Sequence, residues 1–338
     1  MTTTRTVLQE RLINIIKRFG DRRALVVGDA IADQFVYGAI SRVSREAPVF
    51  ILSHEQTETV PGGAANCAMN LVALGARVSL IAVVGDDAAG RALIEKLEAA
   101  GVDCGGVLVL PQLQTTTKVR ILAGQVHSTR QQVIRIDYDG NAVHHADVHA
   151  QLQSKIGEYG SDSDALIISD YNYGVADKTL SQAVQDVVKI KKTPVLVDSR
   201  FKLSDFPGFT SGTPNQDEIE QLLGRPLKNS NELESAGEQM RERLGYRALL
   251  ITRGSQGMVL FEDGVAPIYI NAVGAREPVD VTGAGDTVIA TYALAIASDA
   301  SFSDAARLAN YAGGLVVMKR GTASISAEEL EHSIIYSE

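Results

Sequence analysis

The segment from Asp280 to Asp286, Asp-Val-Thr-Gly-Ala-Gly-Asp, places a carboxylate directly after a turn of small residues. The apolar run 287–297 that follows predicts a buried helix, so the turn lies at the amino end of that helix. Unpaired amides and the positive dipole end of a first helical turn attract anions. Asp286 would repel a resting anion, but it could accept a proton from a hydroxyl that attacks a phosphoryl group. We therefore predict a phosphoryl-transfer site whose catalytic candidates are Asp286 and the turn residues Gly283, Ala284 and Gly285.

Taken alone, this turn is equally compatible with an ordinary helix start. Aspartate often caps helices and is favoured near their positive end. Glycine also adopts a positive φ without penalty in many turns that have no function. The other motifs of the chain have to decide between the two interpretations.

A second set of residues could hold a polar ligand such as a sugar. Gly62 and Gly63 precede a predicted helix and would let the backbone approach a ligand closely, and Asn66 can both donate and accept hydrogen bonds. Asp29 and Asp33 follow the apolar run 24–27 and could accept hydrogen bonds from sugar hydroxyls. A simple helix start and ordinary acids after a strand are the alternatives for these two clusters.

The segment Thr213-Pro-Asn-Gln-Asp-Glu218 could organise magnesium and phosphate groups. Pro214 favours an extended turn, and Asn215 and Glu218 would share one face at a helix start. Such a pair suits Mg²⁺ held through water, with Glu218 as the metal-binding residue, because Mg²⁺ keeps several of its waters. A helix capping box explains the same spacing equally well.

Two near-matches to nucleotide-binding motifs are rejected. Gly85 and Gly90 have the glycine spacing of a P-loop, but Arg91-Ala92 stands where Lys-Ser or Lys-Thr is needed. The glycines at 283 and 285 are followed by Val288 where a dinucleotide fingerprint needs a third glycine. This difference, together with Asp286, argues against an NAD-dependent oxidoreductase.

Composition narrows the class of protein. The chain has 338 residues, of which 45% are hydrophobic and 22% charged, and a net charge of −9. A binder of nucleic acid would need a positive surface, so that partner is disfavoured. No apolar run reaches the roughly 20 residues that cross a bilayer, and the start of the chain does not resemble a signal peptide. We expect a cytoplasmic enzyme without a membrane partner.

Strands and helices are predicted to alternate along most of the chain. Short apolar runs end in polar residues, and the predicted strands are 24–27, 78–84, 165–168, 195–197 and 248–251. Helical segments separate them, at 88–100, 177–191, 217–223 and 231–244, after a first helix over 6–19. This alternation predicts a single α/β domain with a three-layer, doubly wound, mostly parallel sheet. Ligands bind beyond the carboxyl ends of such strands, where Asp29, Asp170, Asp198 and Thr252 fall.

Two segments interrupt this alternation. Residues 34–60 and 107–138 contain short β-like runs without intervening helices. We expect them to form a small inserted β lid over the substrate edge of the main sheet. Edge strands of this kind often pair with another chain, so the sequence predicts a homodimer through the lid.

With these motifs in view, the chain resembles the ribokinase-like (PfkB) carbohydrate kinases over nearly its whole length. Gly62-Gly63 with Asn66 resembles the first signature of that family, and the segment 280–286 resembles its second. Asn215-x-x-Glu218 resembles its magnesium and phosphate motif. Within the family, the chain is most similar to the heptose-7-phosphate kinases of bacterial ADP-heptose synthesis, and the similarity includes the segments 41–49, 169–171 and 256–258.

The resemblance implies a ribokinase-like fold and the transfer of a phosphoryl group from ATP to a hydroxyl of a small sugar or sugar phosphate. It further implies Mg²⁺ and often an activating monovalent cation, such as K⁺, near the turn at 283–286. Our candidates for the nucleotide side of the site are Thr252, Gly254, Gly257 and Asn310.

The chain departs from the heptose-7-phosphate kinases at two places. It has Tyr173 where they usually have the lysine of Asp-Tyr-x-Lys-Gly, and Arg200 where they have the lysine of Asp-Pro-Lys. Both changes alter anion recognition near the site, so heptose 7-phosphate and a different sugar both stay open as acceptors. A binding protein of the same fold without catalysis is the other alternative. The joint presence of Asp286, Asn215 and Glu218 argues against it. No nucleotidyltransferase half is expected within these 338 residues.

Overall fold

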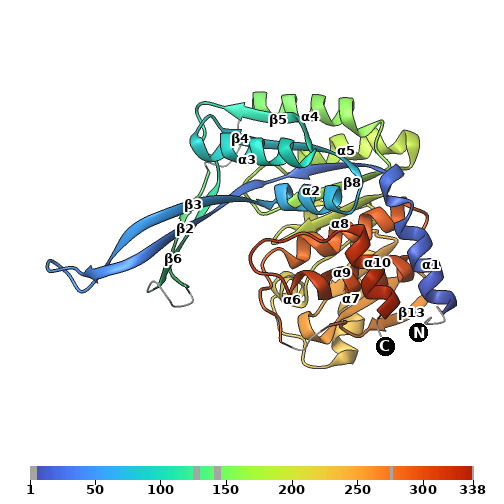
Figure 1. Cartoon of the computed structure of the whole chain (residues 1–338). Coiled ribbons are helices and arrows are strands. Elements are labelled where there is room, and N and C mark those ends of the chain that lie inside the picture. Colours follow the sequence, from blue (N-terminus) through green and yellow to red (C-terminus); the bar gives the residue numbers. More distant parts are fainter. Residues whose placement is uncertain (1–5, 125–129, 141–145, 275–276, 337–338) are drawn as a thin grey trace.

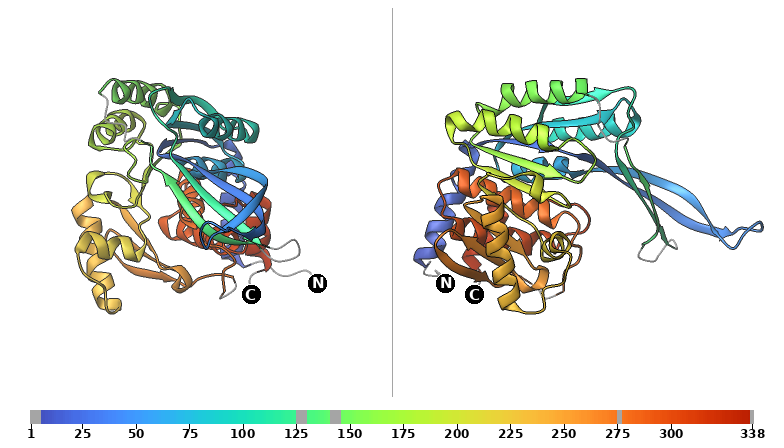
Figure 2. Two further views of the ribbon diagram at one scale, coloured as in Figure 1. Left: turned by 90° about the vertical axis from the view of Figure 1, so that its left-hand side faces the viewer. Right: turned by 180° about the vertical axis from the view of Figure 1, so that it is seen from behind.

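The computed structural model describes residues 6–124, 130–140, 146–274 and 277–336. They form a layered α/β body from which a narrow second sheet projects (Figure 1). The described helices lie on both faces of the main sheet (Figure 2). This is the doubly wound, mostly parallel architecture that the alternation of strands and helices predicts. Among the described residues, no helix is both long and apolar enough to cross a membrane.

The main sheet has nine strands. Their order across the sheet is β13 (Val265–Ile270), β12 (Met258–Glu262), β11 (Ala248–Thr252), β10 (Ser211–Gly212), β9 (Val195–Ser199), β8 (Ala165–Asp170), β1 (Arg23–Gly28), β4 (Arg77–Gly85) and β5 (Asp103–Leu110). Neighbouring strands from β11 to β5 are parallel, whereas β12 and β13 are antiparallel at one edge. The central strands are apolar because helices cover both of their faces.

Two hydrophobic cores lie on opposite faces of the sheet. In β1, Val26 packs into one core and its neighbours Leu25 and Val27 pack into the other. The helices are α1 (Val7–Ile16), α2 (Ala64–Ala73), α3 (Ala88–Ala100), α4 (Ala146–Gly160), α5 (Lys178–Lys191), α6 (Gln216–Leu223), α7 (Ser230–Leu244), α8 (Ala284–Ala297), α9 (Phe302–Val316) and α10 (Ala327–Tyr336). Helix α8 is buried almost all round, as its uniformly apolar sequence predicts.

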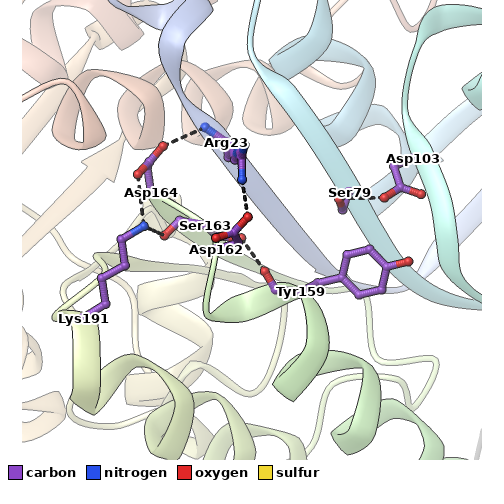
Figure 3. A network of polar contacts seen from close by, with 8 residues as sticks. All are labelled: Arg23, Ser79, Asp103, Tyr159, Asp162, Ser163, Asp164 and Lys191. Carbon is purple, nitrogen blue, oxygen red and sulfur yellow. Dashed lines mark hydrogen bonds and ion pairs between the residues drawn. The ribbon is translucent and has the colours of Figure 1, made fainter.

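A polar network ties elements together at the amino-terminal edge of the sheet (Figure 3). The backbone amide of Arg23, at the start of β1, donates to Asp164 at 3.0 Å, and its guanidinium pairs with Asp162. From the end of α5, Lys191 donates to the carbonyl of Ser163 and to Asp164. These contacts close the edge opposite the carboxyl ends of the strands, where ligands bind in such folds.

The second sheet is the lid. Its strands, in order across the sheet, are β3 (Phe50–Gly63), β2 (Ala30–Val43), β6 (Thr117–Gly124) and β7 (Gln131–Tyr138). The register aligns Asp33 of β2 with Lys118 of β6, and Lys118 with Asp137 of β7. Because side chains alternate along strands, these three residues share one face of the lid. We call the face that carries Asp33, Lys118 and Asp137 the inner face of the lid.

Two expectations about these elements need correction. Residues 107–110, expected in the lid, belong to β5, which pairs in parallel with β4 and extends the main sheet. Their continuous apolar run suits a strand covered by helices better than a lid strand. The first helix, expected over 6–19, ends at Ile16 and is followed by a short 3₁₀ turn at Phe19–Asp21.

Candidate active site

The turn before α8 is shaped by Gly283. This residue has φ +76°, a left-handed conformation that side chains other than glycine rarely adopt. A Cβ atom here would lie 2.6 Å from Nδ2 of Asn66. The amide of Ala284 donates to the carbonyl of Val281. Among the described residues, the amides of Gly285 and Asp286 have no such partner, and they lie at the positive end of α8.

Asp286 is 2% exposed and is held by two side chains. Its Oδ2 accepts a hydrogen bond from Asn66 Nδ2 at 2.7 Å, and its Oδ1 accepts one from the Tyr171 hydroxyl at 2.9 Å. Burial raises the pKa of Asp286 to about 6, although both hydrogen bonds lower it. The carboxylate is therefore mostly ionised at pH 7, and each oxygen keeps a lone pair that can accept a proton.

Asn66 is itself held by a buried polar chain. Asn70, one turn further along α2, donates from Nδ2 to the side-chain oxygen of Asn66 at 3.2 Å. The hydroxyl of Thr287 donates to Asn70 Oδ1 at 2.8 Å. Helices α2 and α8 are thus locked together around Asp286, and Asn66 is oriented so that its amide nitrogen faces the carboxylate.

Asp29 has contacts that differ from those expected of a sugar-binding residue. Its Oδ2 accepts hydrogen bonds from the amides of Tyr171 (2.8 Å) and Tyr173 (3.0 Å), and its Oδ1 accepts one from the amide of Val175 (3.1 Å). Burial raises the pKa of Asp29 to about 6 despite these three bonds. Asp29 therefore organises the 171–175 loop, which carries Tyr171 to Asp286.

Gly63 packs directly against Asp29, and Gly62 packs directly against Asp33. Gly63 has φ +59°, and a Cβ atom there would lie 2.5 Å from the carbonyl oxygen of Asp29. At Gly62, a Cβ atom would lie 2.5 Å from Oδ2 of Asp33. The carboxylate of Asp33 also pairs with the guanidinium of Arg120. These are the last residues of β3 and directly precede α2, so both glycines allow a close approach of neighbouring groups that a side chain would prevent.

Asn215 and Glu218 form the capping box that was the alternative interpretation of their spacing. Asn215 Oδ1 accepts from the amide of Glu218, and Glu218 Oε2 accepts from the amide of Asn215, both at 2.8 Å. Burial raises the pKa of Glu218 to about 6, against the lowering effects of these bonds and of Arg200. The second carboxylate oxygen of Glu218 stays available for a ligand. Burial and the charges of Glu218 and Asp286 also raise the pKa of Asp198 well above its usual value.

The four candidates for the nucleotide side line one cavity of about 210 Å³. These residues are Thr252, Gly254, Gly257 and Asn310, and Ala284 and Gly285 lie on the same wall. Asn310 is buried and donates from Nδ2 to the carbonyl of Asn271 at 2.8 Å. The remaining lining is mostly apolar, including Met258 and Val288. The cavity therefore adjoins the anion-binding turn, as a site for a nucleotide base must.

Two residues near Asp286 are missing from the set of site candidates predicted from sequence: Tyr171 and Lys118. Tyr171 follows β8, and only its place after a strand-end aspartate signals a function. Lys118 and Arg120 alternate with Val119 and Ile121, a pattern that usually indicates a strand with one solvated face. In the structure that face turns inward to the site.

The family model for pfkB family carbohydrate kinases matches residues 22–329 of the chain. This chain belongs to that family. The match spans the second sheet, the turn at 283–286 and the cavity beside Asn310. The chain is therefore a carbohydrate kinase, a phosphotransferase that acts on an alcohol group.

Curated relatives share this sequence at moderate identity. Bifunctional protein HldE of Geobacter metallireducens is 40% identical over 311 residues, which cover 92% of this chain and 62% of that protein. Bifunctional protein HldE of Edwardsiella ictaluri is 40% identical over 321 residues, covering 94% and 64%. The chain thus spans less than two thirds of the length of these relatives.

Solved structures share the fold of this pfkB-family kinase. Arabidopsis thaliana ribokinase complexed with ribose and ATP has a TM-score of 0.73 at 22% identity, covering 94% of this chain and 99% of that one. Phosphofructokinase-2 from Escherichia coli in complex with potassium has a TM-score of 0.76 at 20% identity, covering 93% and 98%. At these identities the likeness establishes the ribokinase-like fold.

Proposed function

We propose that Asp286 acts as the general base of this carbohydrate kinase and removes a proton from an acceptor hydroxyl as that oxygen attacks the γ-phosphorus of ATP. The observation that carries the proposal is the buried carboxylate beside free helix amides. The carboxylate accepts the proton, and the amides of Gly285 and Asp286 stabilise the charge on the transferring group. The hydrogen bonds from Asn66 and Tyr171 keep the carboxylate in one orientation.

The donor side fits ATP with magnesium. The adenine ring of ATP would enter the cavity beside Asn310, and its phosphates would run along Gly285 toward Asp286. Among the described residues, no group of three or more acidic, histidine or cysteine side chains could hold a metal by itself. Mg²⁺ would therefore take most of its ligands from phosphate and water, with Glu218 and Asp198 as the nearby carboxylates. Bound Mg²⁺ would neutralise phosphate charge. Because ATP is the donor, we place the enzyme in the cytoplasm.

A monovalent cation such as K⁺ fits next to the turn. The hydroxyl oxygen of Thr322 is buried and has no hydrogen-bond partner among the described residues. The methyl group of Thr322 would lie 3.2 Å from a Cβ atom on Gly283. An unsatisfied oxygen in that position suits a cation that orders the anion-binding turn. Turnover should then rise when K⁺ replaces a large organic cation at constant ionic strength.

On the acceptor side, we propose heptose 7-phosphate as the first compound to test. The resemblance to heptose-7-phosphate kinases and the similarity to the HldE proteins support it. Asn66, which donates to Asp286, and Asp33, whose charge acts on Asp286, would bind the sugar hydroxyls. A different sugar or sugar phosphate is the competing acceptor, because Tyr173 and Arg200 replace two lysines of that subfamily.

We also propose that the enzyme is a homodimer joined through the lid. The lid face opposite Asp33 carries Val119 and Ile121 of β6 and the exposed Ile134, Ile136 and Tyr138 of β7. The exposure of these three β7 side chains leaves apolar surface in contact with solvent in the single chain, and a second lid would bury it on both chains. Ile134→Lys should give a monomer by sedimentation at micromolar concentration. A wild-type monomer under those conditions would exclude this assembly.

The function is tested by coupled ADP release over a panel of sugars and sugar phosphates. Asp286→Asn should lower kcat by about 10²–10⁴ while ATP binding stays nearly intact. The control is Asp186→Asn, at an exposed acid on α5, which should match the wild type. An Asp286→Asn enzyme with wild-type turnover would show that Asp286 is not the base.

A further inference from the structure

We propose that Lys118 binds a phosphate group carried by the acceptor, at the end of the acceptor remote from the reacting hydroxyl. The inference rests on the proposed function and deepens it. It assigns the specificity for an anionic sugar to a lid residue that has no role in proton transfer.

Lys118 is an unusual lysine. Only 9% of it is exposed, and within the described part of the chain its ammonium has no hydrogen bond or ion pair. It lies 5.6 Å from the ring centre of Tyr171 and 5.9 Å from that of Tyr173. Burial lowers the pKa of Lys118. A buried cation without a partner is costly unless a ligand neutralises it.

The acids nearest to Lys118 are paired with other residues, so its ammonium group can bind an anionic ligand. The two nearby acids on the inner face of the lid are already paired, Asp33 with Arg120 and Asp137 with Arg135. Arg135 and Arg200 are near enough for their positive charges to act on Lys118. Asp33 and Asp137 also act on Lys118 through their charges, but neither forms an ion pair with it, so the ammonium can still bind an anion. A phosphate monoester carries about −1.5 to −2 near pH 7.

The position of Tyr171 sets the geometry of the acceptor. Its hydroxyl contacts Asp286, while the face of its ring lies below the ammonium of Lys118. One tyrosine side chain therefore spans the interval between the base and the cation. An acceptor that lies along this side chain would present a hydroxyl at Asp286 and an anionic substituent at Lys118.

Tyr173 lines the proposed phosphate site with an aromatic ring instead of a second charge. The heptose-7-phosphate kinases usually have a lysine at this position, and here an aromatic ring replaces that charge. The ring forms a second wall beside Lys118 instead of a second cation. Because Tyr173 adds no charge, phosphate binding then depends on Lys118, with Arg135 and Arg200 as the other nearby cations.

The experiment compares Lys118→Met, Lys118→Arg and the surface control Lys189→Met with the wild type. Each is assayed with heptose 7-phosphate and with unphosphorylated heptose, and competition by inorganic phosphate is measured. Lys118→Met should raise KM for heptose 7-phosphate about 10- to 100-fold, as expected for loss of a charged hydrogen bond. KM for ATP and turnover of the unphosphorylated sugar should change little. Lys118→Arg should restore much of the affinity, and phosphate should inhibit the wild type but not Lys118→Met.

The outcomes separate this inference from the proposed function. An equal loss with both acceptors would mean that Lys118 only shapes the lid, and a rise in KM for ATP would mean that it serves the donor phosphates. Either result overturns the inference, as does a wild type that accepts only unphosphorylated sugars. Failure of the wild type to release ADP with any acceptor would instead overturn the proposed function. Thermal unfolding of Lys118→Met checks folding, and its midpoint should not fall, because the variant removes a buried unpaired charge.

Discussion

Tyr171 joins two acids that lie far apart in the sequence, one through its side chain and one through its backbone. Its hydroxyl donates to Oδ1 of Asp286 at 2.9 Å, and its backbone amide donates to Oδ2 of Asp29 at 2.8 Å. Asp29 thus fixes the loop, the loop fixes the tyrosine, and the tyrosine orients the carboxylate of Asp286. Within the described ranges of the chain, the carboxylate of Asp286 forms no ion pair and is held by the hydrogen bonds from Asn66 and Tyr171.

The first prediction concerns the pH dependence of kcat/KM. The pKa of Asp286 is raised to about 6 by burial, so activity should fall as pH drops through about 6 and the base becomes protonated. The hydrogen bond from Tyr171 lowers that pKa, so Tyr171→Phe should move the acidic limb to higher pH. An unchanged limb in this variant would show that Tyr171 does not act on the base. Rate profiles from pH 5 to 9 measure both effects.

The second prediction concerns Asp29→Asn. Asparagine would turn an NH₂ group toward at least one of three backbone amides, so that two donors face each other. We expect a loss of about 1–3 kcal/mol in the free energy of unfolding and a lower kcat, since the 171–175 loop would no longer hold Tyr171. Urea denaturation and steady-state kinetics test this. If Asp29 instead binds only sugar, acceptor KM would rise while stability stays unchanged.

The stability contribution of Asp29 has a definite sign with pH. Its folded pKa of about 6 is above the usual value of 3.8, so its protonated form is favoured in the folded state. The contribution is fully present below about pH 3.8 and is lost as pH rises through about 6. The pH dependence of wild-type stability between pH 4.5 and 7 should therefore be flatter in Asp29→Asn.

A matched pair of glycine variants tests the turn before α8. Gly283→Ala forces a side chain into φ +76° and toward Asn66, whereas a Cβ atom on Gly285 meets nothing closer than Asp198 Oδ2 at 3.9 Å. We expect Gly283→Ala to lower the unfolding free energy by about 1–3 kcal/mol, and Gly285→Ala to leave it within about 0.5 kcal/mol. Equal stabilities for the two variants would contradict the described turn.

Glu218 combines a cap with a candidate contact to magnesium, and two substitutions separate these roles. Glu218→Gln keeps an oxygen for the capping box but removes the charge, so stability should be retained while half-saturation by Mg²⁺ rises about 10-fold or more. Glu218→Ala should also lose about 1 kcal/mol of stability. Magnesium titrations of kcat, alongside thermal melts, provide the readout. An unchanged magnesium requirement in Glu218→Gln would assign this residue to capping alone.

Local patterns in the sequence were sufficient for five parallel strands of the main sheet and for the turn at 283–286. The apolar runs that end in polar residues identify β1, β4, β8, β9 and β11, because a strand buried on both faces requires such a run. The same local logic failed for residues 107–110. A short apolar run does not reveal which sheet it joins, and only the pairing of β5 with β4 decides that.

The sequence alone determined which chemical groups this kinase carries and that they stand at strand ends and at a helix start. The tertiary structure decided what each group contacts. Asn66 and Asp286 are 220 residues apart in the chain, yet their side chains meet at 2.7 Å. Asp29, predicted to bind sugar, accepts three backbone amides of the 171–175 loop. Lys118, in a pattern typical of an exposed strand, is buried beside two tyrosines. Such pairings depend on how the lid, α2 and α8 pack together, and periodicity along one segment contains no information about contacts between distant segments.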